Sequence, residues 1–304
     1  MSGGRVRGVS EAVLLSCHGT VESTADLPAF LSNIRRGRPT PPALVEEVTR
    51  RFEAIGGSPL MRITRAQGEA LAERTGARVA IAGRLWHPYP KEVLAGLVAD
   101  GVRRVVSLPL APQSVHVYHA AVREAAAGFP GLEVVEVPAW GNEPRLVDAF
   151  VESIDEALAP LAEAERVATT VVLTAHSLPQ RIIDSGDPYE RDFRAMASLV
   201  AARVEARGNP VQVSFQSQGA TNDVWLGPDL PATFRALAEG GARTVAVAPI
   251  GFVADHVETL YDLDIEAQAL AKSVGLQLVR ATAMNLRPAF IDALAAVAGR
   301  ALAR

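Results

Sequence analysis

Residues 251–266, GFVADHVETLYDLDIE, combine one histidine with a series of carboxylates, and after Asp255 the segment is predicted to be a helix. On that helix Glu258, Asp262 and Glu266 follow at intervals of four, so they share one face. Like charges at this spacing destabilise a helix by about 0.2–0.5 kcal/mol per pair, and the segment contains no lysine or arginine to offset them. A solvated acidic surface is the ordinary interpretation of such a face.

The position of this helix favours a functional interpretation. It directly follows the apolar run TVAVAPIGF (244–252), so it begins at the carboxyl end of a predicted buried strand. Open α/β sheets bind their ligands at that edge. His256 adds a nitrogen donor or proton carrier two residues before Glu258.

A second histidine ends another apolar run. In TAHSLPQR (174–181) the predicted strand finishes on His176, and Ser177 and Pro179 then turn the chain. A lone histidine is more often a packed core residue than a catalyst. This one, however, should open into the same cleft as Glu258, because both follow strands of one sheet. A histidine facing a glutamate in such a cleft suits proton abstraction and transient metal capture.

The elements that must position these side chains form an α/β protein. Short β-branched apolar runs alternate with alanine- and leucine-rich helical segments, which predicts parallel sheets with helices on both faces. The predicted strands are residues 12–17, 78–84, 104–110 and 133–139 in the first half, and 170–176, 211–217, 244–250 and 276–281 in the second.

The two halves of the sequence resemble each other. VLLSCHG is echoed by VVLTAHS, and VVSLPLAP by VAVAPIGF. We therefore predict two similar Rossmann-like, doubly wound domains, residues 1–160 and 161–304, with a ligand site between them. A last amphipathic helix, 286–304, could pack back on the first domain.

Composition excludes several classes of function. Thirty basic and 34 acidic residues give a net charge of −4, and aromatic residues are only 5%, which argues against nucleic acid as a partner. Cys17 is the only cysteine, so an iron–sulfur cluster is excluded and a cytoplasmic protein is expected. Neither G-x-G-x-x-G after the first strand nor a phosphate loop is present, which argues against a nucleotide cofactor. No run is long enough to span a membrane.

Several motifs, taken together and in order, resemble ferrochelatases, the enzymes that insert ferrous iron into a porphyrin during haem biosynthesis. The resemblance covers nearly the whole chain. The motifs are FLSNIRRGRPTPPALVEEVTRRFEAIGGSPLMRITRAQ, GRLWHPYPKEVL, TAHSLPQRIIDSGDPYE, WLGPDL, GFVADHVETLYDLDIE and NLRPAFIDALA.

The resemblance implies roles for the two features described first. It makes His176 the proton acceptor and a metal ligand, and Glu258 a relay for protons or metal. Asp262 and Glu266 then continue a row of hard oxygen ligands on a locally widened helix, along which a hydrated cation loses water stepwise. Fe²⁺ is a substrate, and the redox-neutral exchange requires no cofactor.

Further residues match family positions that contact the porphyrin: Arg35, Arg36, Arg51, Ser58 and Tyr118. Arginines suit bidentate pairing with propionates. Trp86 is interpreted as an apolar wall or as a core residue. His18 replaces the residue usual at the end of the first strand, and it is either an axial ligand of product iron or a packed loop residue.

Alternatives at this stage are a noncatalytic haem- or porphyrin-binding relative and a cobalt or nickel chelatase of the same fold. Retention of both His176 and Glu258 argues against the first, and the long IRRGRP…RRFEAIGGSPL block against the second. The motifs fit protoporphyrin IX and coproporphyrin III equally. Peripheral membrane contact and the oligomeric state also stay open.

Overall fold

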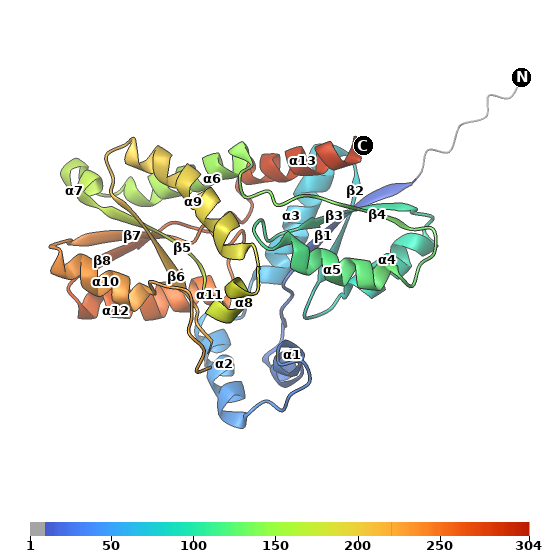
Figure 1. Cartoon of the computed structure of the whole chain (residues 1–304), viewed down its shortest axis with the longest axis horizontal. Helices are drawn as coiled ribbons and strands as arrows, with labels where there is room; N and C mark the ends of the chain where they lie inside the picture. The colour runs from blue at the N-terminus through green and yellow to red at the C-terminus, as the bar shows by residue number, and fades with distance from the viewer. Residues whose placement is uncertain (1–9, 220, 304) are drawn as a thin grey trace, which may run out of the picture.

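Two four-stranded parallel sheets form the frame of the molecule, which a computed structural model describes over residues 10–219 and 221–303. The first sheet has the order β2-β1-β3-β4 and the second the order β6-β5-β7-β8 (Figure 1). Their strands are β1 (Glu11–Cys17), β2 (Arg78–Gly83), β3 (Arg104–Pro109), β4 (Glu133–Glu136), β5 (Thr170–His176), β6 (Val211–Gln216), β7 (Thr244–Ala248) and β8 (Gln277–Arg280). The repeated order confirms the predicted α/β fold and all eight predicted strands.

Helices cover both faces of each sheet. In the first half they are α1 (Leu27–Ile34), α2 (Pro42–Ala54), α3 (Leu60–Thr75), α4 (Pro90–Ala99) and α5 (Val115–Ala126). They continue with α6 (Pro144–Leu158), α7 (Glu163–Ala168), α8 (Gln180–Asp184), α9 (Tyr189–Glu205), α10 (Leu230–Glu239), α11 (Val257–Leu260), α12 (Gln268–Ser273) and α13 (Pro288–Leu302). Within the described ranges no helix is long and apolar enough to cross a membrane.

Alternate residues of each central strand enter different cores, because both faces of a parallel sheet are buried. In β1, Val13 and Leu15 belong to the large core, whereas Ala12 and Leu14 pack under α4 and α5. The large core is continuous between the halves, since it also contains Leu173 of β5 and residues of α6, α9 and α13.

Two helices connect the halves of the molecule. Helix α6 packs against α9 and β7, and α13 packs against α6 and also against α3 and β3 of the first half. The C-terminal helix therefore returns to the first sheet. The division of the chain at residue 160 stays a prediction.

The strand order fixes where a ligand site can form. In each sheet the second strand lies on one side of the first strand and the third strand lies on the other side. The connections therefore diverge between β1 and β3 and between β5 and β7, and a crevice opens at the carboxyl ends of these strands. His18 follows β1, His176 ends β5, and α11 follows β7. Helices α1 and α2 form a lobe below these ends (Figure 1).

Candidate active site

A cavity of about 280 Å³ lies between the α1–α2 lobe and the segment that follows β7. One wall is apolar, and its residues come from α1, α2 and the start of α3: Phe30, Leu31, Ile34, Leu44, Val48, Phe52 and Leu60. The opposite side carries His18, His256, Glu258 and Asp262. A flat apolar ligand with a polar reacting centre would fit between these two surfaces.

His176 reaches the site from the last position of β5. Its Nδ1 hydrogen-bonds the carbonyl oxygen of Ser177, so in the neutral ring Nδ1 carries the hydrogen and Nε2 keeps its lone pair. Nε2 lies 3.7 Å from Glu258 Oε1. The Tyr189 hydroxyl donates to the His176 carbonyl at 2.8 Å and so fixes the strand end. The predicted histidine–glutamate pair is thus brought together.

His256 approaches Glu258 from the other side. Its Nδ1 faces the carbonyl of Ala254 at 3.1 Å, and its Nε2 lies 3.5 Å from Glu258 Oε2. Burial lowers the pKa of His256, but the hydrogen bond and charge of Glu258 outweigh this and raise it overall. For Glu258 the directions are opposite: burial alone would raise the pKa of the carboxyl. The neighbouring charges of His176 and His256 outweigh burial and lower the pKa of Glu258 to about 2. Glu258 is therefore an anion between two imidazoles.

His18 also lines the cavity. Its side chain is exposed in the cleft, although the protein atoms that surround it there reduce its solvation. This desolvation lowers the pKa of His18 to about 4, and the charge of Arg84 contributes in the same direction. The negative charge of Glu258 acts in the opposite direction but is weaker. The ring is therefore neutral at pH 7 and can act as a nitrogen ligand.

The acidic row lies on a helix that widens at the expected place. Between α11 and α12 the segment Asp262–Ala267 is a π-helix, and Glu266 N donates to Tyr261 O at 3.0 Å, five residues back. Ser217 Oγ donates to Asp262 Oδ2 at 2.5 Å. Burial raises the pKa of Asp262 to about 6, and Glu258 contributes in the same sense. Asp262 therefore titrates close to neutral pH.

Arg51, a residue predicted to contact porphyrin carboxylates, lies against this acidic row. From α2 its guanidinium contacts Asp262 Oδ1 at 3.2 Å and Glu266 Oε1 at 3.5 Å, and it also pairs with Glu47 at 2.7 Å. The helix supplies no cation of its own, so a neighbouring helix provides one. Arg51 thus balances the row from across the cleft.

A second cavity of about 330 Å³ lies on the far side of the row. Arg51 and Asp262 border both cavities, whereas Glu258 lines only the first and Glu266 only the second. The side chain of Asp262 is 10% exposed, compared with 50% for Glu266. The carboxylates therefore lead from the second cavity, past the largely buried Asp262, to the half-buried pair of His176 and Glu258 in the first.

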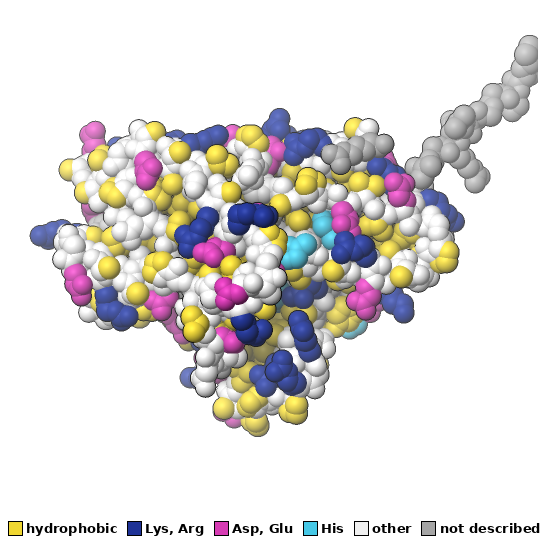
Figure 2. Space-filling view, viewed as in Figure 1, with side chains coloured by type: hydrophobic (Ala, Val, Ile, Leu, Met, Phe, Trp, Pro, Cys, Tyr) yellow, Lys and Arg dark blue, Asp and Glu magenta, His cyan; other side chains and the backbone are white. Residues whose placement is uncertain are grey.

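The remaining predicted contact residues are distributed differently. Ser58 lines the first cavity, and its buried Oγ has no hydrogen-bond partner among the described residues. Arg35 and Arg36 follow the end of α1, outside the cavity lining, and Arg35 Nε donates to Pro39 O at 3.1 Å. Trp86 packs edge-on behind Phe30, at 5.9 Å between ring centroids, so Phe30 presents the apolar surface. Figure 2 shows Lys and Arg side chains gathered on this lower lobe.

Tyr118 lies beneath Arg84, whose guanidinium carbon is 5.7 Å from the centre of the tyrosine ring. Sequence reasoning missed Arg84, and its buried Nε has no partner within residues 10–219 and 221–303. It also missed Gln216, which donates to Glu258 O at 2.9 Å and accepts from Thr174 at 2.6 Å. Gln216 pairs with His176 in the sheet, so a polar strand end was the available signal.

The ligands predicted for metal do not form one preassembled site. Among the described residues, no cluster of three or more His, Cys, Asp and Glu side chains is arranged to hold a metal ion. Successive carboxylates along a helix offer instead a series of partial ligand sets. This arrangement suits an ion in transit better than a resident one.

Comparison with known proteins supports the interpretation drawn from the motifs. The sequence model of the family described as Ferrochelatase matches residues 10–302. The chain is 36% identical to a protein named ferrochelatase from Deinococcus radiodurans, over 95% of each chain. It is 35% identical to one named coproporphyrin III ferrochelatase from Bacillus pumilus, over 94% of this chain and 95% of that one.

Solved structures agree on the fold. SirB from Bacillus subtilis with Fe³⁺ superposes with a TM-score of 0.61 at 15% identity, over 96% of this chain and 95% of that chain. The structure described as CbiX, the terminal enzyme for biosynthesis of siroheme, gives a TM-score of 0.54 at 16% identity, over 95% and 99% of the two chains. At this level of identity the likeness extends to the architecture alone.

Proposed function

Because the chain belongs to the ferrochelatase family and is thus an enzyme that inserts ferrous iron into a porphyrin, we propose that His176 and Glu258 carry out the insertion. The observation that carries this proposal is their apposition at 3.7 Å beside an apolar cavity. Insertion replaces two pyrrole N–H bonds with bonds to iron and releases two protons. The site therefore needs a base that accepts these protons and a group that passes them on to solvent.

His176 is the proposed proton acceptor. Its Nδ1 is committed to the Ser177 carbonyl, which leaves Nε2 as the basic nitrogen on the side of Glu258. A positioned base of this kind typically contributes about 10²–10⁴-fold to a rate. Protonated His176 would lie against the Glu258 carboxylate, which stabilises its charge and can pass the proton on.

The apolar wall supports the macrocycle in this proposal. Contacts with Phe30, Phe52 and Leu60 would press one face of the porphyrin, while the pyrrole nitrogens face the histidines and Glu258. Bending the ring exposes the nitrogen lone pairs, and remote contacts of this kind can supply roughly 1–5 kcal/mol of strain. Ser58 offers a free hydroxyl to the ligand, and Arg35 and Arg36 offer cations to the propionates at the rim.

Iron is proposed to enter through the second cavity. Glu266 meets the hydrated ion first, Asp262 next and Glu258 last, so oxygen ligands replace water stepwise. Arg51 must yield its contacts with Asp262 and Glu266 to the incoming cation. His18 is proposed as a neutral nitrogen ligand on product iron.

Other parts of the proposal come from the sequence. We propose a cytoplasmic enzyme that needs no cofactor, iron–sulfur cluster, nucleotide or nucleic acid. The single cysteine, Cys17, is buried, which supports this proposal. We also propose peripheral contact with a membrane, in which the exposed apolar side chains of Ile34 and Val224 would insert.

The test is an anaerobic assay of the purified protein with ferrous iron, followed by the porphyrin absorption bands. Protoporphyrin IX and coproporphyrin III are run in parallel, because the relatives' names include both the general and the coproporphyrin activity. Catalytic loss of the free-porphyrin bands is expected with one of them. Binding of both without turnover would identify a porphyrin- or haem-binding relative instead.

A further inference from the structure

The π-helical segment Asp262–Ala267 requires support from its surroundings. A π-turn adds a residue to the helix and is found mostly as short bulges at functional sites. Here Tyr261 O accepts both from Ile265 N at 3.1 Å and from Glu266 N at 3.0 Å, so the α and π hydrogen bonds compete at one carbonyl. Contacts outside the helix must therefore favour the wider form.

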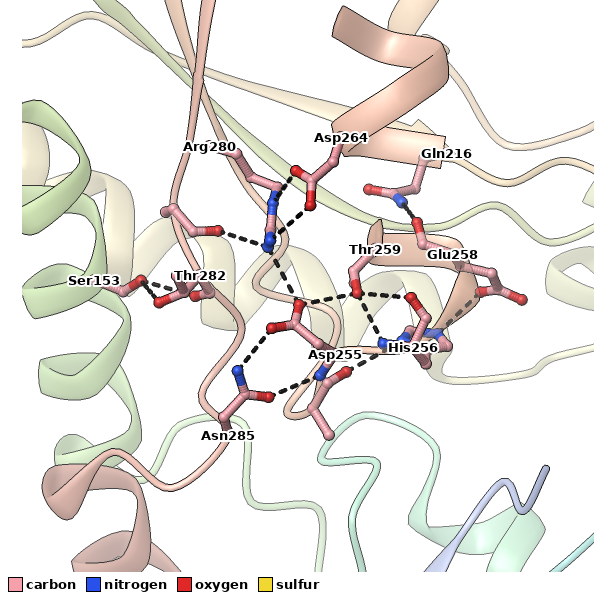
Figure 3. Close-up of polar contacts among 12 residues, drawn as sticks. Ser153, Gln216, Asp255, His256, Glu258, Thr259, Asp264, Arg280, Thr282 and Asn285 are labelled. Atoms are coloured by element: carbon pink, nitrogen blue, oxygen red, sulfur yellow. Dashed lines mark hydrogen bonds and ion pairs between the residues drawn. The ribbon is translucent and has the colours of Figure 1, made fainter. Parts of the chain in front are cut away.

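Arg280, the last residue of β8, makes such contacts. Its guanidinium forms a two-pronged pair with the Asp264 carboxylate, in which NH2 lies 3.0 Å from Oδ2 (Figure 3). The same guanidinium donates through NH1 to Asp255 Oδ1 at 3.2 Å. The arginine side chain is only 12% exposed. One side chain therefore joins Asp255, two residues before α11, to the middle of the π-segment.

Asp255 is itself held on every side. Thr259 Oγ1 donates to its Oδ1 at 3.0 Å, and Asn285 Nδ2 donates to its Oδ2 at 2.7 Å. Asn285 Oδ1 also accepts from Asp255 N at 2.8 Å. Figure 3 shows these side chains meeting at Asp255, beside His256. Arg280 therefore pulls Asp264 toward an anchor that is already fixed.

The two sides of the π-segment face different arginines. Asp262 and Glu266 contact Arg51 on the cleft side, whereas Asp264 contacts Arg280. Without Arg280, Asp264 would be free to follow the helix back toward α geometry. That rewinding would rotate Asp262 and Glu266 relative to Glu258, because each residue of an α-helix turns by about 100°.

We propose that Arg280 is a positioning residue for the metal step: it keeps the π-turn wound so that the three carboxylates stay in line. This inference rests on the proposed function, since it assigns a role only if the row carries the metal substrate. Arg280 lines neither cavity, so its effect would pass through Asp264 and Asp255.

The experiment compares Arg280→Gln with the wild-type protein in steady-state assays, varying zinc and porphyrin separately. We expect the KM for the metal to rise about tenfold, equivalent to about 1.4 kcal/mol, with the KM for porphyrin within twofold. Hydrogen exchange should quicken in residues 261–267. Isothermal titration with zinc alone gives a readout that does not depend on turnover, and it should weaken by a similar factor.

Three further variants separate positioning from general destabilisation. Asp264→Asn breaks the same ion pair by changing its more exposed partner. It should raise the KM for metal in the same way, and it keeps the test valid if Arg280→Gln folds poorly. Arg280→Lys keeps the charge and should restore part of the affinity. Arg104→Gln is the matched control, because Arg104 is also 12% exposed and pairs with Glu11 and Glu133 on the other sheet.

The outcomes distinguish the two proposals. If the wild-type protein turns over no porphyrin, the proposed function fails. If the wild-type protein is active but Arg280→Gln and Asp264→Asn keep its KM and affinity for metal, the inference about Arg280 is overturned. Equal losses in Arg280→Gln and Arg104→Gln would also overturn it, because they would indicate loss of stability alone.

Discussion

His176 Nε2 lies 3.7 Å from Glu258 Oε1, and His256 Nε2 lies 3.5 Å from Glu258 Oε2. One carboxylate is thus shared by two imidazoles, one from the end of β5 and one from the segment between β7 and α11. Each imidazole has its Nδ1 placed against a backbone carbonyl. The arrangement presents basic nitrogens and a fixed negative charge at the same point of the cleft.

Replacement of His176 by alanine should abolish metal insertion without unfolding the protein. The side chain is one-third exposed and makes one side-chain hydrogen bond, so its loss should cost only about 1 kcal/mol of stability. His116→Ala is the matched control, because His116 is also partly exposed and pairs with an acid, Asp187. Full activity in His176→Ala with a normal melting curve would rule out the assignment.

Glu258→Gln should lower kcat by roughly 10²-fold or more, because the amide keeps the shape of the side chain but removes the charge shared by the two histidines. The measurement is a single-turnover assay with saturating porphyrin and metal. Porphyrin affinity should stay near the wild-type value. An unchanged rate would show that the carboxylate takes no part in proton or metal transfer.

Asp262→Asn should act mainly on the metal. The variant keeps a hydrogen-bond acceptor for Ser217 but offers the cation no charge, so we expect a several-fold rise in the KM for metal with little change in kcat. Glu239→Gln, at the exposed end of α10, controls for the loss of one acidic charge. If the metal dependence stays the same, the row of carboxylates does not conduct the ion.

The same variant should change the dependence of stability on pH in the metal-free protein. The pKa of Asp262 is about 6 in the folded state, above its ordinary value of 3.8. Between pH 3.8 and pH 6 the folded protein therefore keeps Asp262 protonated, whereas the unfolded chain has lost this proton. Stability from this group is present below pH 4 and is lost as the pH rises through 6. Asp262→Asn should therefore melt about 2–4 °C above wild type at pH 7, whereas at pH 4 the two proteins should melt at the same temperature. An identical difference at both pH values would contradict the shifted pKa.

His18→Ala should alter the spectrum of the product complex. With a pKa of about 4, His18 is neutral at pH 7 and can bind iron through nitrogen. We expect the Soret band of bound haem to shift and product release to become faster. A spectrum identical to that of the wild type would place His18 among the packing residues.

Much of the fold could be predicted because buried parallel strands have a simple sequence pattern. All eight strands were found, and His176 and Glu258 were located because each follows such a strand. The π-segment was expected from the resemblance to the family. These features depend on order along the chain, which the sequence contains directly.

The roles that were not predicted depend on contacts between distant segments. Arg51 was expected at the propionates, and its contacts with Asp262 and Glu266 also join it to a helix more than two hundred residues later. Trp86 was an apolar candidate, and only the placement of α1 puts Phe30 in front of it. Nothing in the local sequence marks Arg280 as the partner of Asp255 and Asp264.

The continuous core has a mechanical consequence for the reaction. Because strands of both sheets pack on shared side chains, the two halves cannot swing apart without opening a close-packed interior. We therefore expect the protein to act as a stiff frame, so that a porphyrin bound between the apolar wall and the histidines would be the more deformable body. In the proposed mechanism the substrate would therefore take up the elastic deformation, and it would relax once the ring has received its metal.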